Sequence, residues 1–360
     1  MTRLLKSYFS LLIQSIIFWS IVFLSFSFFR HFGLSQQMAF FVDEPLNIPT
    51  ELLYEPLLIL AIGFGVGFSI IEFIFQNFIS KRLSILINVA LKAIIYLILL
   101  ILILTPITFF IELSIDRDIP NEIGWWRESK LFWAILVYTA LGSVIFSTLT
   151  ILKEKFGRQN FLSMLVGKYR KPQEEEKIFM FLDLKSSTTI AESLGHFKYS
   201  SFIQDCFKDL NNIIKNYDAE IYQYVGDEAV LTWDYKKGLA YNNCVNFFFK
   251  FNRILKKKES YYNNKYGFLP TFKAGLHGGK VIITEVGTVK KEIAYHGDVI
   301  NTAARIQSQC NVYDKLLLIS EKLLKDLDLR HYNNQSMGNI ALRGKEEMVE
   351  LYAVEYFSKK

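Results

Sequence analysis

The sequence predicts a bundle of four transmembrane helices followed by a mixed α+β domain. Four apolar stretches in residues 1–151 approach the length of about 20 residues that a helix needs to cross a bilayer. The mean hydropathy of +0.21 is too high for an ordinary soluble protein and too low for a pure membrane bundle. Residues 1–150 carry 9 Lys and Arg against 10 Asp and Glu, whereas residues 151–360 carry 32 against 25. This division excludes a disordered, collagen-like or disulfide-rich chain.

The chain divides into three expected parts: a membrane domain over 1–151, a helical linker that transmits signals over 152–176, and an α+β domain over 177–356. The expected spans are about Leu11–Phe29, Leu57–Phe75, Ala93–Ile111 and Leu131–Ile151. Within the linker, apolar residues at roughly helical spacing are compatible with a short parallel coiled coil. An amphipathic helix that packs on its own domain explains the same spacing equally well.

The positions of the basic residues predict the orientation in the membrane, because cytoplasmic loops are enriched in Lys and Arg. They precede the first span, separate the second from the third and follow the fourth: Arg3, Lys6, Lys81, Arg82, Lys153, Lys155 and Arg158. We therefore expect a multi-pass protein of the cell membrane with both termini and the α+β domain in the cytoplasm. The three cysteines all lie in this domain without metal-ligand spacing, so we expect no disulfides.

Two ionisable residues, Glu72 and Lys92, lie near the cytoplasmic ends of the second and third spans. They can form a buried pair or a sensing site. The alternative, which the sequence alone favours, is that both side chains extend to the membrane surface.

Alternating strands and helices with a hairpin predict an α+β sandwich of ferredoxin-like type for the second half. The apolar run Lys177–Leu184 predicts a buried strand that ends near Asp183. The runs Glu220–Tyr224 and Glu228–Trp233 flank a turn that contains Gly226 and Asp227, which predicts a hairpin. The expected helices are about Phe197–Asn216, Leu239–Lys257 and a third from Gly297 to Gln309, and the other expected strands are Thr271–Leu276, Lys280–Thr284, Lys290–Tyr295, Leu316–Ile319 and Val349–Val354.

Two aspartates are candidate metal ligands. If the strands that carry Asp183 and Asp227 are neighbours, their carboxylates face one space, and a cation removes the repulsion between them. Hard oxygen ligands suit Mg²⁺ or Mn²⁺. The structural alternative is a strand-terminal Asp183 and an ordinary turn aspartate at 227.

Several polar residues are candidates for binding a nucleotide. Small polar residues that lead into a helix can offer N–H groups to a phosphate, although a plain helix cap has the same composition. Asn301 and Arg305 share one helix face and suit a sugar and a phosphate, or form a solvated face. The polar residues that lead into a helix are Lys185, Ser186, Ser187 and Thr188. A charged turn near the C-terminus contains Arg343, Gly344 and Lys345.

Four motifs in order, FLDLKSST, YVGDEAV, GDVINTAAR and LRGKEEMVELYAV, resemble the catalytic domain of class III nucleotidyl cyclases. The resemblance covers about Ile178–Tyr356, and the whole chain resembles bacterial membrane-anchored adenylate cyclases. It implies that Asp183 and Asp227 hold two Mg²⁺ or Mn²⁺ ions per active site, with help from the Leu184 carbonyl. It also implies that the site forms between two subunits of a homodimer.

The resemblance implies further roles on the substrate. Asn301 would orient the ribose, Arg305 would stabilise charge on the α-phosphate, and Lys345 would bind the terminal phosphates. The reaction would be attack of the ribose 3′-hydroxyl of ATP on the α-phosphate, which yields 3′,5′-cyclic AMP and pyrophosphate. The expected partners are ATP, a second copy of the chain, the lipid bilayer and an unidentified ligand or membrane partner at the membrane domain. No nucleic acid is expected, because the cations are dispersed.

Two positions depart from the family pattern. At the position that corresponds to Gln223 of this chain, adenylate cyclases commonly have a lysine. At the position that corresponds to Ala294, they have an Asp or Thr. Guanylate cyclases have Glu and Cys at these two positions, so ATP is the favoured substrate. Tyr295, His296 or backbone groups are alternative readers of the base. A guanylate or low-selectivity purine cyclase, and a catalytically silent cyclase-like receptor, remain the alternative functions.

Overall fold

The computed structural model describes residues 3–41, 51–79, 84–115, 124–156, 163, 166–289, 291–341 and 348–356. The chain forms two compact units, Met1–Leu152 and Lys153–Lys360. Each unit has a hydrophobic core of its own.

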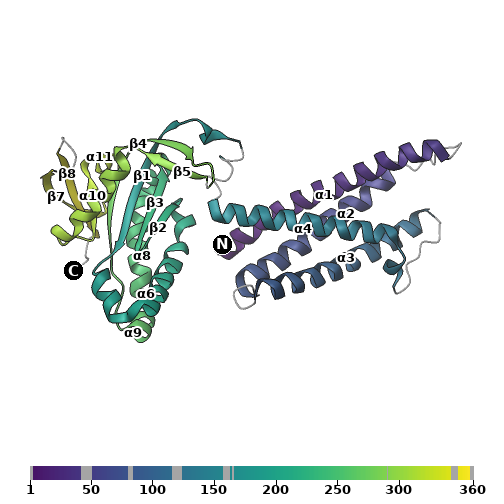
Figure 1. Cartoon of the computed structure of the whole chain (residues 1–360), viewed down its shortest axis with the longest axis horizontal. Helices are drawn as coiled ribbons and strands as arrows, with labels where there is room; N and C mark the ends of the chain where they lie inside the picture. Colours follow the sequence, from purple (N-terminus) through teal and green to yellow (C-terminus); the bar gives the residue numbers. More distant parts are fainter. Residues whose placement is uncertain are drawn as a thin grey trace. The chain divides into compact units, whose positions relative to one another are not determined.

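The first unit consists of helices that lie side by side (Figure 1). They are α1 (Arg3–Phe41), α2 (Glu51–Ile74), α3 (Ile85–Ile115) and α4 (Lys130–Phe156). In the described part of the chain, three apolar stretches are long enough to cross a membrane: Tyr8–Arg30, Ile87–Ile107 and Phe132–Thr150. The expected second span is shorter, because its apolar part is Leu58–Ile74. The structure therefore supports three of the four expected spans by length and composition.

Glycines allow the helices of this unit to pack closely. A Cβ atom at Gly65 of α2 would lie 2.9 Å from the Cα atom of Ile16 on α1, and one at Gly142 of α4 would lie 3.0 Å from the ring of Trp19. Small residues at helix contacts are typical of membrane bundles, where packing replaces the hydrophobic effect. The outward side chains of α1 include Ile13, Ile17 and Ile21, as expected for helices that face lipid.

The expectation that Glu72 and Lys92 extend to the membrane surface is wrong. The Glu72 side chain is only 6% exposed, and both of its carboxylate oxygens accept hydrogen bonds of 2.8 Å from Lys92 Nζ. The hydroxyl of Tyr96 donates a third hydrogen bond, of 2.7 Å, to the same carboxylate. The two charges are paired inside the bundle because α3 places Lys92 and Tyr96 one turn apart, both against α2.

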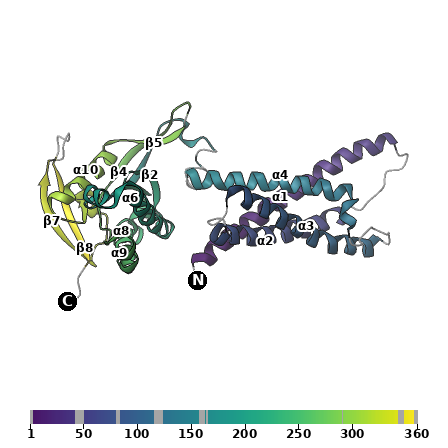
Figure 2. The same ribbon diagram turned by 60° about the horizontal axis from the view of Figure 1, so that its bottom comes forward.

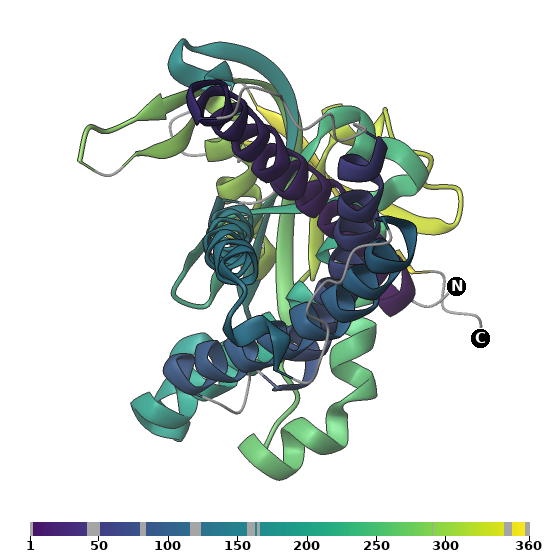
Figure 3. The same cartoon turned by 90° about the vertical axis from the view of Figure 1, so that its right-hand side faces the viewer.

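The second unit is built on an eight-stranded sheet with the order β2-β3-β1-β4-β6-β8-β7, and β5 pairs with β4. All neighbouring pairs are antiparallel except β4 and β6. The strands are β1 (Gln173–Leu184), β2 (Glu220–Val225), β3 (Glu228–Asp234), β4 (Phe272–Val286), β5 (Glu292–His296), β6 (Leu317–Ser320), β7 (Tyr332–Ile340) and β8 (Val349–Tyr356). The β4–β5 hairpin projects from the sheet (Figures 2 and 3).

Helices cover both faces of this sheet. On one face, α6 (Ser187–Asn211), α8 (Asn243–Lys257) and α9 (Glu259–Tyr266) contribute to the largest core (Figure 1). On the other face, α10 (Asp298–Val312) packs with Val299 and Ala303 against β1 and β4. Two short helices complete the unit, α7 (Tyr235–Leu239) and α11 (Glu321–Leu324). A central strand covered on both faces reads as an unbroken apolar run, which explains the sequence of β1.

Side chains of β1 alternate between the two faces. Met180 and Leu182 belong to the core under α6 and α8, whereas Phe179 and Phe181 belong to the core under α10. Because successive side chains of a strand point to opposite faces, Asp183 lies on the α10 face. The active-site candidates of β1 and α10 are thus on one side of the sheet.

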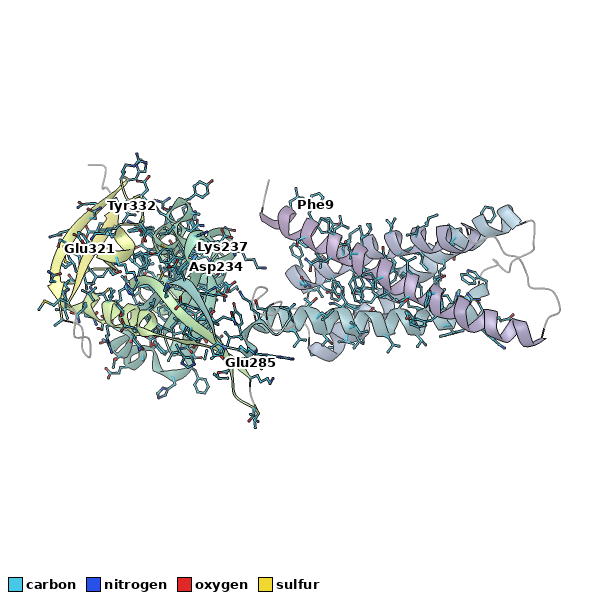
Figure 4. All side chains as sticks on the ribbon, turned by 90° about the horizontal axis from the view of Figure 1, so that it is seen from above. Phe9, Asp234, Lys237, Glu285, Glu321 and Tyr332 are labelled. Carbon is cyan, nitrogen blue, oxygen red and sulfur yellow. The ribbon has the colours of Figure 1, made fainter. Side chains whose placement is uncertain are left out.

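Ion pairs join β1 and β3 at the end of these strands that is distant from Asp183. Lys177 of β1, whose side chain is 4% exposed, donates to Asp234 of β3 and lies 3.2 Å from Glu175. Lys237 contacts the second oxygen of Asp234 at 2.7 Å (Figure 4). Burial lowers the pKa of Lys177, but the hydrogen bond and charge of Asp234 outweigh it and raise the pKa overall. These contacts fix the register that places the other ends of the two strands together.

Several expected boundaries are wrong. Strand β1 begins at Gln173, so the expected linker 152–176 ends inside a strand. Helix α6 begins at Ser187, ten residues before the expected start, but it is kinked at Gly195 (φ 69°), whose backbone is not helical, so the part after the kink begins near the expected Phe197. The two strands expected over 271–284 are one continuous strand, β4. Helix α9 and strand β7 have no counterpart among the expected elements.

Gly275 of β4 makes the contact with α10 possible, and this generates a prediction. A Cβ atom there would lie 2.2 Å from the backbone nitrogen of Gln307 and 2.7 Å from the carbonyl oxygen of Ala303. Gly275→Ala should therefore destabilise the unit by about 1–3 kcal/mol, the usual cost of overpacking. This corresponds to a fall in melting temperature of roughly 2–12 °C, measured on the full chain in detergent.

The matched control is Gly279→Ala on the same strand. The atoms nearest to its Cβ would be Lys322 Nζ, the end of a flexible side chain, and a methyl group of Val299, both at 3.0 Å and neither of them backbone, so a smaller loss of stability is expected. Equal melting temperatures for the Gly275 variant and the native chain would contradict the assigned contact between β4 and α10.

Candidate active site

Asp183 and Asp227 lie at the ends of neighbouring strands. Leu182 of β1 is paired with Ala229 of β3, so the next residues, Asp183 and Glu228, face each other across the strands. Asp227 precedes Glu228 in the β2–β3 turn, where Gly226 (φ 61°) has the left-handed conformation that the two-residue turn requires. The expected hairpin is confirmed, and it places the second aspartate next to the first.

Two side chains bind the same oxygen of Asp183. Gln307 Nε2 of α10 donates to Oδ2 at 2.9 Å, and Lys273 Nζ of β4 lies 3.1 Å from it. Burial raises the pKa of Asp183, the hydrogen bond and charge of Lys273 lower it, and the charge of Asp227 raises it, with a net increase. The carboxylate is therefore held in an environment where additional positive charge is favourable.

Other titratable groups respond to the same pair of carboxylates. Burial, followed by the charges of Asp183 and Asp227, raises the pKa of Glu228 to about 7. Burial and then the charges of Asp227 and Asp183 raise the pKa of Tyr199, on α6, to about 12. Asp183, Asp227, Glu228 and Tyr199 thus share one region of negative potential.

The residues present fit a divalent cation. Asp227 Oδ2 is buried and has no hydrogen-bond partner among the described residues, which is costly for a carboxylate unless a cation binds there. In the described part of the chain, no three Asp, Glu, His or Cys side chains are arranged around one metal position. A bound Mg²⁺ would take these two carboxylates as ligands and water or phosphate oxygens at its other positions, as Mg²⁺ prefers.

The residues after Asp183 form the start of α6. The side chain of Leu184 points into the core under α6, which leaves only its backbone for a metal. Ser186 (φ 60°) precedes the helix without a side-chain cap, and Ser187 is its first residue. Thr188 is exposed in the first turn. Lys185 Nζ contacts Asp314 at 2.7 Å, so it must leave this partner to bind a phosphate.

Asn301 and Arg305 lie on α10, but they are not turned towards Asp183. At about 100° per residue, Arg305 lies about 40° from Asn301 and about 200° from Gln307, which contacts Asp183. Asn301 is exposed. Arg305 Nη1 is buried and has no hydrogen-bond partner among the described residues. One chain therefore does not bring the Asn–Arg pair and the two aspartates together.

A bulge in β2 determines where Gln223 points. The pairing shifts by one residue between Ile221 and Gln223, which leaves Tyr222 as the additional residue. Two residues of a bulge point to the same side of a sheet, and Tyr222 packs on Tyr295 of β5 at a ring distance of 4.8 Å. Gln223 is therefore placed on the α10 face, and its side chain is exposed.

Residue Tyr295 is not available to contact a nucleotide base. It is 7% exposed, and its ring packs edge to face on both Phe179 and Tyr222. Ala294 is half-buried in β5 opposite Thr284, and His296 is exposed. Of the groups named as alternatives for contacting the nucleotide base, His296 and the backbone are still available. Lys345 lies outside the described residues.

Sequence reasoning missed Lys273 and Gln307. Lys273 was part of an expected strand, and the sequence indicated a special role only by placing a single basic residue in an apolar run. Gln307 was two positions beyond Arg305 and carried no signal, because only the packing of α10 on the sheet brings it to Asp183. Tyr199 was likewise unmarked.

Comparisons with known proteins identify the family of the second half of the chain. Residues 170–355, just over half of the chain, match the model of the adenylate and guanylate cyclase catalytic domain. The chain therefore belongs to the class III cyclase family, and the cyclase fold expected for the second half is confirmed.

Individual relatives include "Adenylate cyclase 2" of Rhizobium meliloti (strain 1021), 36% identical over 195 residues that cover 54% of this chain and 53% of that one. An adenylate cyclase of Anabaena cylindrica is 23% identical over 225 residues, 56% of this chain and 42% of that one. The chain thus spans about half the length or less of these relatives. A solved bacterial light-regulated adenylyl cyclase shares the fold, with a TM-score of 0.53 and 20% identity over 63% of this chain and 66% of that chain.

The hydrogen bond from Gln307 to Asp183 generates a prediction about metal binding. Gln307→Leu should lower the affinity for Mn²⁺ by about 10–100-fold, the usual effect of removing a partner of a metal ligand. The measurement is a Mn²⁺ titration followed by electron paramagnetic resonance on the full chain. Gln309→Leu, the same change on the same helix, is the control and should bind like the native chain. Unchanged affinity of the Gln307 variant for Mn²⁺ would contradict the assignment of Asp183 as a metal ligand.

Proposed function

We propose that the protein is a membrane-bound adenylate cyclase that converts ATP to 3′,5′-cyclic AMP and pyrophosphate as a homodimer. The observation that carries the proposal is the adjacency of Asp183 and Asp227 at the ends of β1 and β3. Membership of the cyclase family and the similarity to two adenylate cyclases support the same activity.

The divalent ions of this family would be held by Asp183 and Asp227, with the Leu184 carbonyl as a further ligand. Two bound Mg²⁺ or Mn²⁺ ions would lower the pKa of the ribose 3′-hydroxyl and neutralise charge on the phosphates. The unpartnered Asp227 Oδ2 and the raised pKa of Asp183, which burial causes first, are the features that fit them. Lys273 adds a fixed positive charge next to Asp183.

In the reaction, the ribose 3′-oxygen forms a bond to the α-phosphorus, the bond from this phosphorus to the β-phosphate oxygen breaks, and the hydroxyl proton leaves to solvent. Asn301 would orient the ribose, and Arg305 would stabilise the charge that develops on the α-phosphate. Residues 185–188 at the start of α6, together with Lys345, would bind the phosphate chain. Positioning and charge supply the catalysis, without a protein nucleophile.

The position of α10 supports a homodimer. Since Gln307 holds one face of α10 against Asp183, Arg305 (about 160° away around the helix) and Asn301 (about 120° away) are directed away from the aspartates of their own chain. A second copy in an isologous arrangement would provide each aspartate pair with an Asn–Arg pair, giving two equivalent sites.

Adenine is the proposed base, because Gln223 and Ala294 do not form the Glu–Cys pair typical of guanylate cyclases. Gln223 both donates and accepts hydrogen bonds, and the bulge at Tyr222 places it on the site face. The membrane unit would anchor the chain in the cell membrane, with the cyclase domain and both termini in the cytoplasm, as the basic residues predict.

The substrate prediction is tested by turnover. The full chain in detergent with Mn²⁺ should form cyclic AMP from ATP and at least about tenfold less cyclic GMP from GTP, a difference of about 1.4 kcal/mol in transition-state binding. Asp227→Ala should abolish both products. Predominant cyclic GMP would establish a guanylate cyclase instead, and absence of both products from the native chain would indicate a silent cyclase-like receptor.

The dimer prediction is tested by mixing inactive variants. Co-expression of Asp227→Ala with Arg305→Ala should restore about a quarter of the native rate, because half of the dimers are mixed and each has one intact site of two. Co-expression of Asp183→Ala with Asp227→Ala is the matched control and should restore nothing, because both changes affect the same half of the site. Equal rates for the two mixtures would exclude a site shared between copies.

A further inference from the structure

The membrane unit contains a polar cluster that its anchoring role does not require. Glu72 of α2 accepts two hydrogen bonds of 2.8 Å from Lys92 and one of 2.7 Å from Tyr96, both on α3. We refer to these three residues as the polar lock. The side chains of Glu72 and Lys92 are 6% and 20% exposed, respectively, and among the described residues of this unit the other buried polar side chains are uncharged serines and a threonine.

Stability alone does not explain the polar lock. The removal of two charges from water costs about as much as their attraction returns, and apolar residues of similar size usually stabilise a core at least as well. The best-established use of such a pair is to fix the register of two elements or to switch between registers. Ionisable groups inside a membrane bundle are for the same reason most often functional.

The end of α2 supports this interpretation independently. Three residues after Glu72 the helix changes to a π-helical turn, η1 (Phe75–Ile79), a feature that is rare and often found at functional sites. Phe75, the first residue of the turn, is 2% exposed, and Lys92 Nζ lies 5.3 Å from the centre of its ring. The polar lock and the irregular turn therefore share one cation.

Aromatic contacts connect the polar lock to the other helices. The ring of Tyr96 stacks on Phe68 of α2 at 4.8 Å. Phe68 in turn contacts Trp19 of α1 at 5.1 Å and Phe146 of α4 at 5.0 Å. Trp19 is fully buried, and Gly142 of α4 lies against its ring. A displacement of Tyr96 must therefore be accommodated by α1 and α4, because packed cores deform little.

Helix α4 is the part of the membrane unit that precedes the cyclase domain in the chain, since it extends to Phe156 and β1 begins at Gln173. We propose that the polar lock Glu72–Lys92–Tyr96 is a control point that fixes α2 against α3 and, through the aromatic contacts of Phe68, sets the state of α4 and the output of the cyclase. The part that concerns cyclase output rests on the proposed function; the part that concerns α4 does not.

The experiment compares three variants of the full chain in detergent or nanodiscs. Lys92→Met leaves a buried carboxylate unpaired, Tyr96→Phe removes only the hydroxyl, and the double variant Glu72→Gln/Lys92→Met removes both charges. Glu128→Gln, the same chemical change at an exposed position of the membrane unit, is the control. The readouts are melting temperature, hydrogen–deuterium exchange of residues 146–156 in α4, and kcat and KM for ATP.

We expect Lys92→Met to lower the melting temperature, and the double variant to melt close to the native chain. All three variants should increase exchange in 146–156 by about threefold or more, and should change kcat about fivefold or more at unchanged KM, in the usual range for coupled sites. The control should change none of these. If the pair of charges were only structural, the double variant would instead have the exchange, the kcat and the melting temperature of the native chain.

Unchanged exchange in α4 for both Lys92→Met and the double variant would overturn the proposal. This outcome is independent of turnover. If the native chain formed no cyclic nucleotide while exchange in α4 still responded, the proposed function would fail and the proposed link from the polar lock to α4 would stand.

Discussion

The negative charge of Asp183 is the constraint around which the cyclase domain is organised. It lies at the end of a strand buried on both faces, next to Asp227 and opposite Glu228, where burial and repulsion both oppose ionisation. Lys273 and Gln307 compensate part of this cost from β4 and α10. Compensation by the protein is incomplete, as the unpartnered oxygen of Asp227 indicates. A divalent ion would supply the remaining positive charge. The two carboxylates are therefore suited to binding a metal ion because placing them together without one is electrostatically unfavourable.

In the proposed homodimer, the same contact would determine how two copies of the chain cooperate. The hydrogen bond between Gln307 and Asp183 fixes the rotation of α10, and in this rotation Arg305 does not face the aspartates of its own chain. The guanidinium has a buried nitrogen without a partner among the described residues, which suits a phosphate brought by a second subunit. In the membrane unit, a second compensated carboxylate, that of Glu72, has the corresponding role of fixing how helices meet. Both units thus use a buried acid to specify geometry, which apolar packing specifies less strictly.

Local patterns in the sequence predicted most of the strands and the candidate residues. The hairpin around Asp227 and the helix that carries Asn301 and Arg305 occur within one to three residues of the expected positions, because turn chemistry and helical spacing are local. The part of α6 before Gly195 was missed. Gly195 (φ 69°) interrupts the helical geometry, so the part after it begins near the expected Phe197, and Ile190 and Leu194 pack the part before it on the core. The second span was overestimated by one residue at each end, and at its C-terminal end α2 changes to the π-helical turn η1 at Phe75.

Residue types and their spacing were sufficient to predict apolar spans, and the resemblance of four motifs to a known family was sufficient to predict a cyclase domain, because each of these depends on neighbours in the chain. The roles of the two aspartates and of the Asn–Arg pair stay predictions. Contacts between distant segments could be established only by packing. Gln307 reaches Asp183 because Gly275 allows α10 to approach β4, and the bulge at Tyr222 turns Gln223 to the site face. The pairing of Glu72 with Lys92 depends on the register of two helices. Register and approach distance are decided by the shapes of all side chains between two elements, which no local pattern contains.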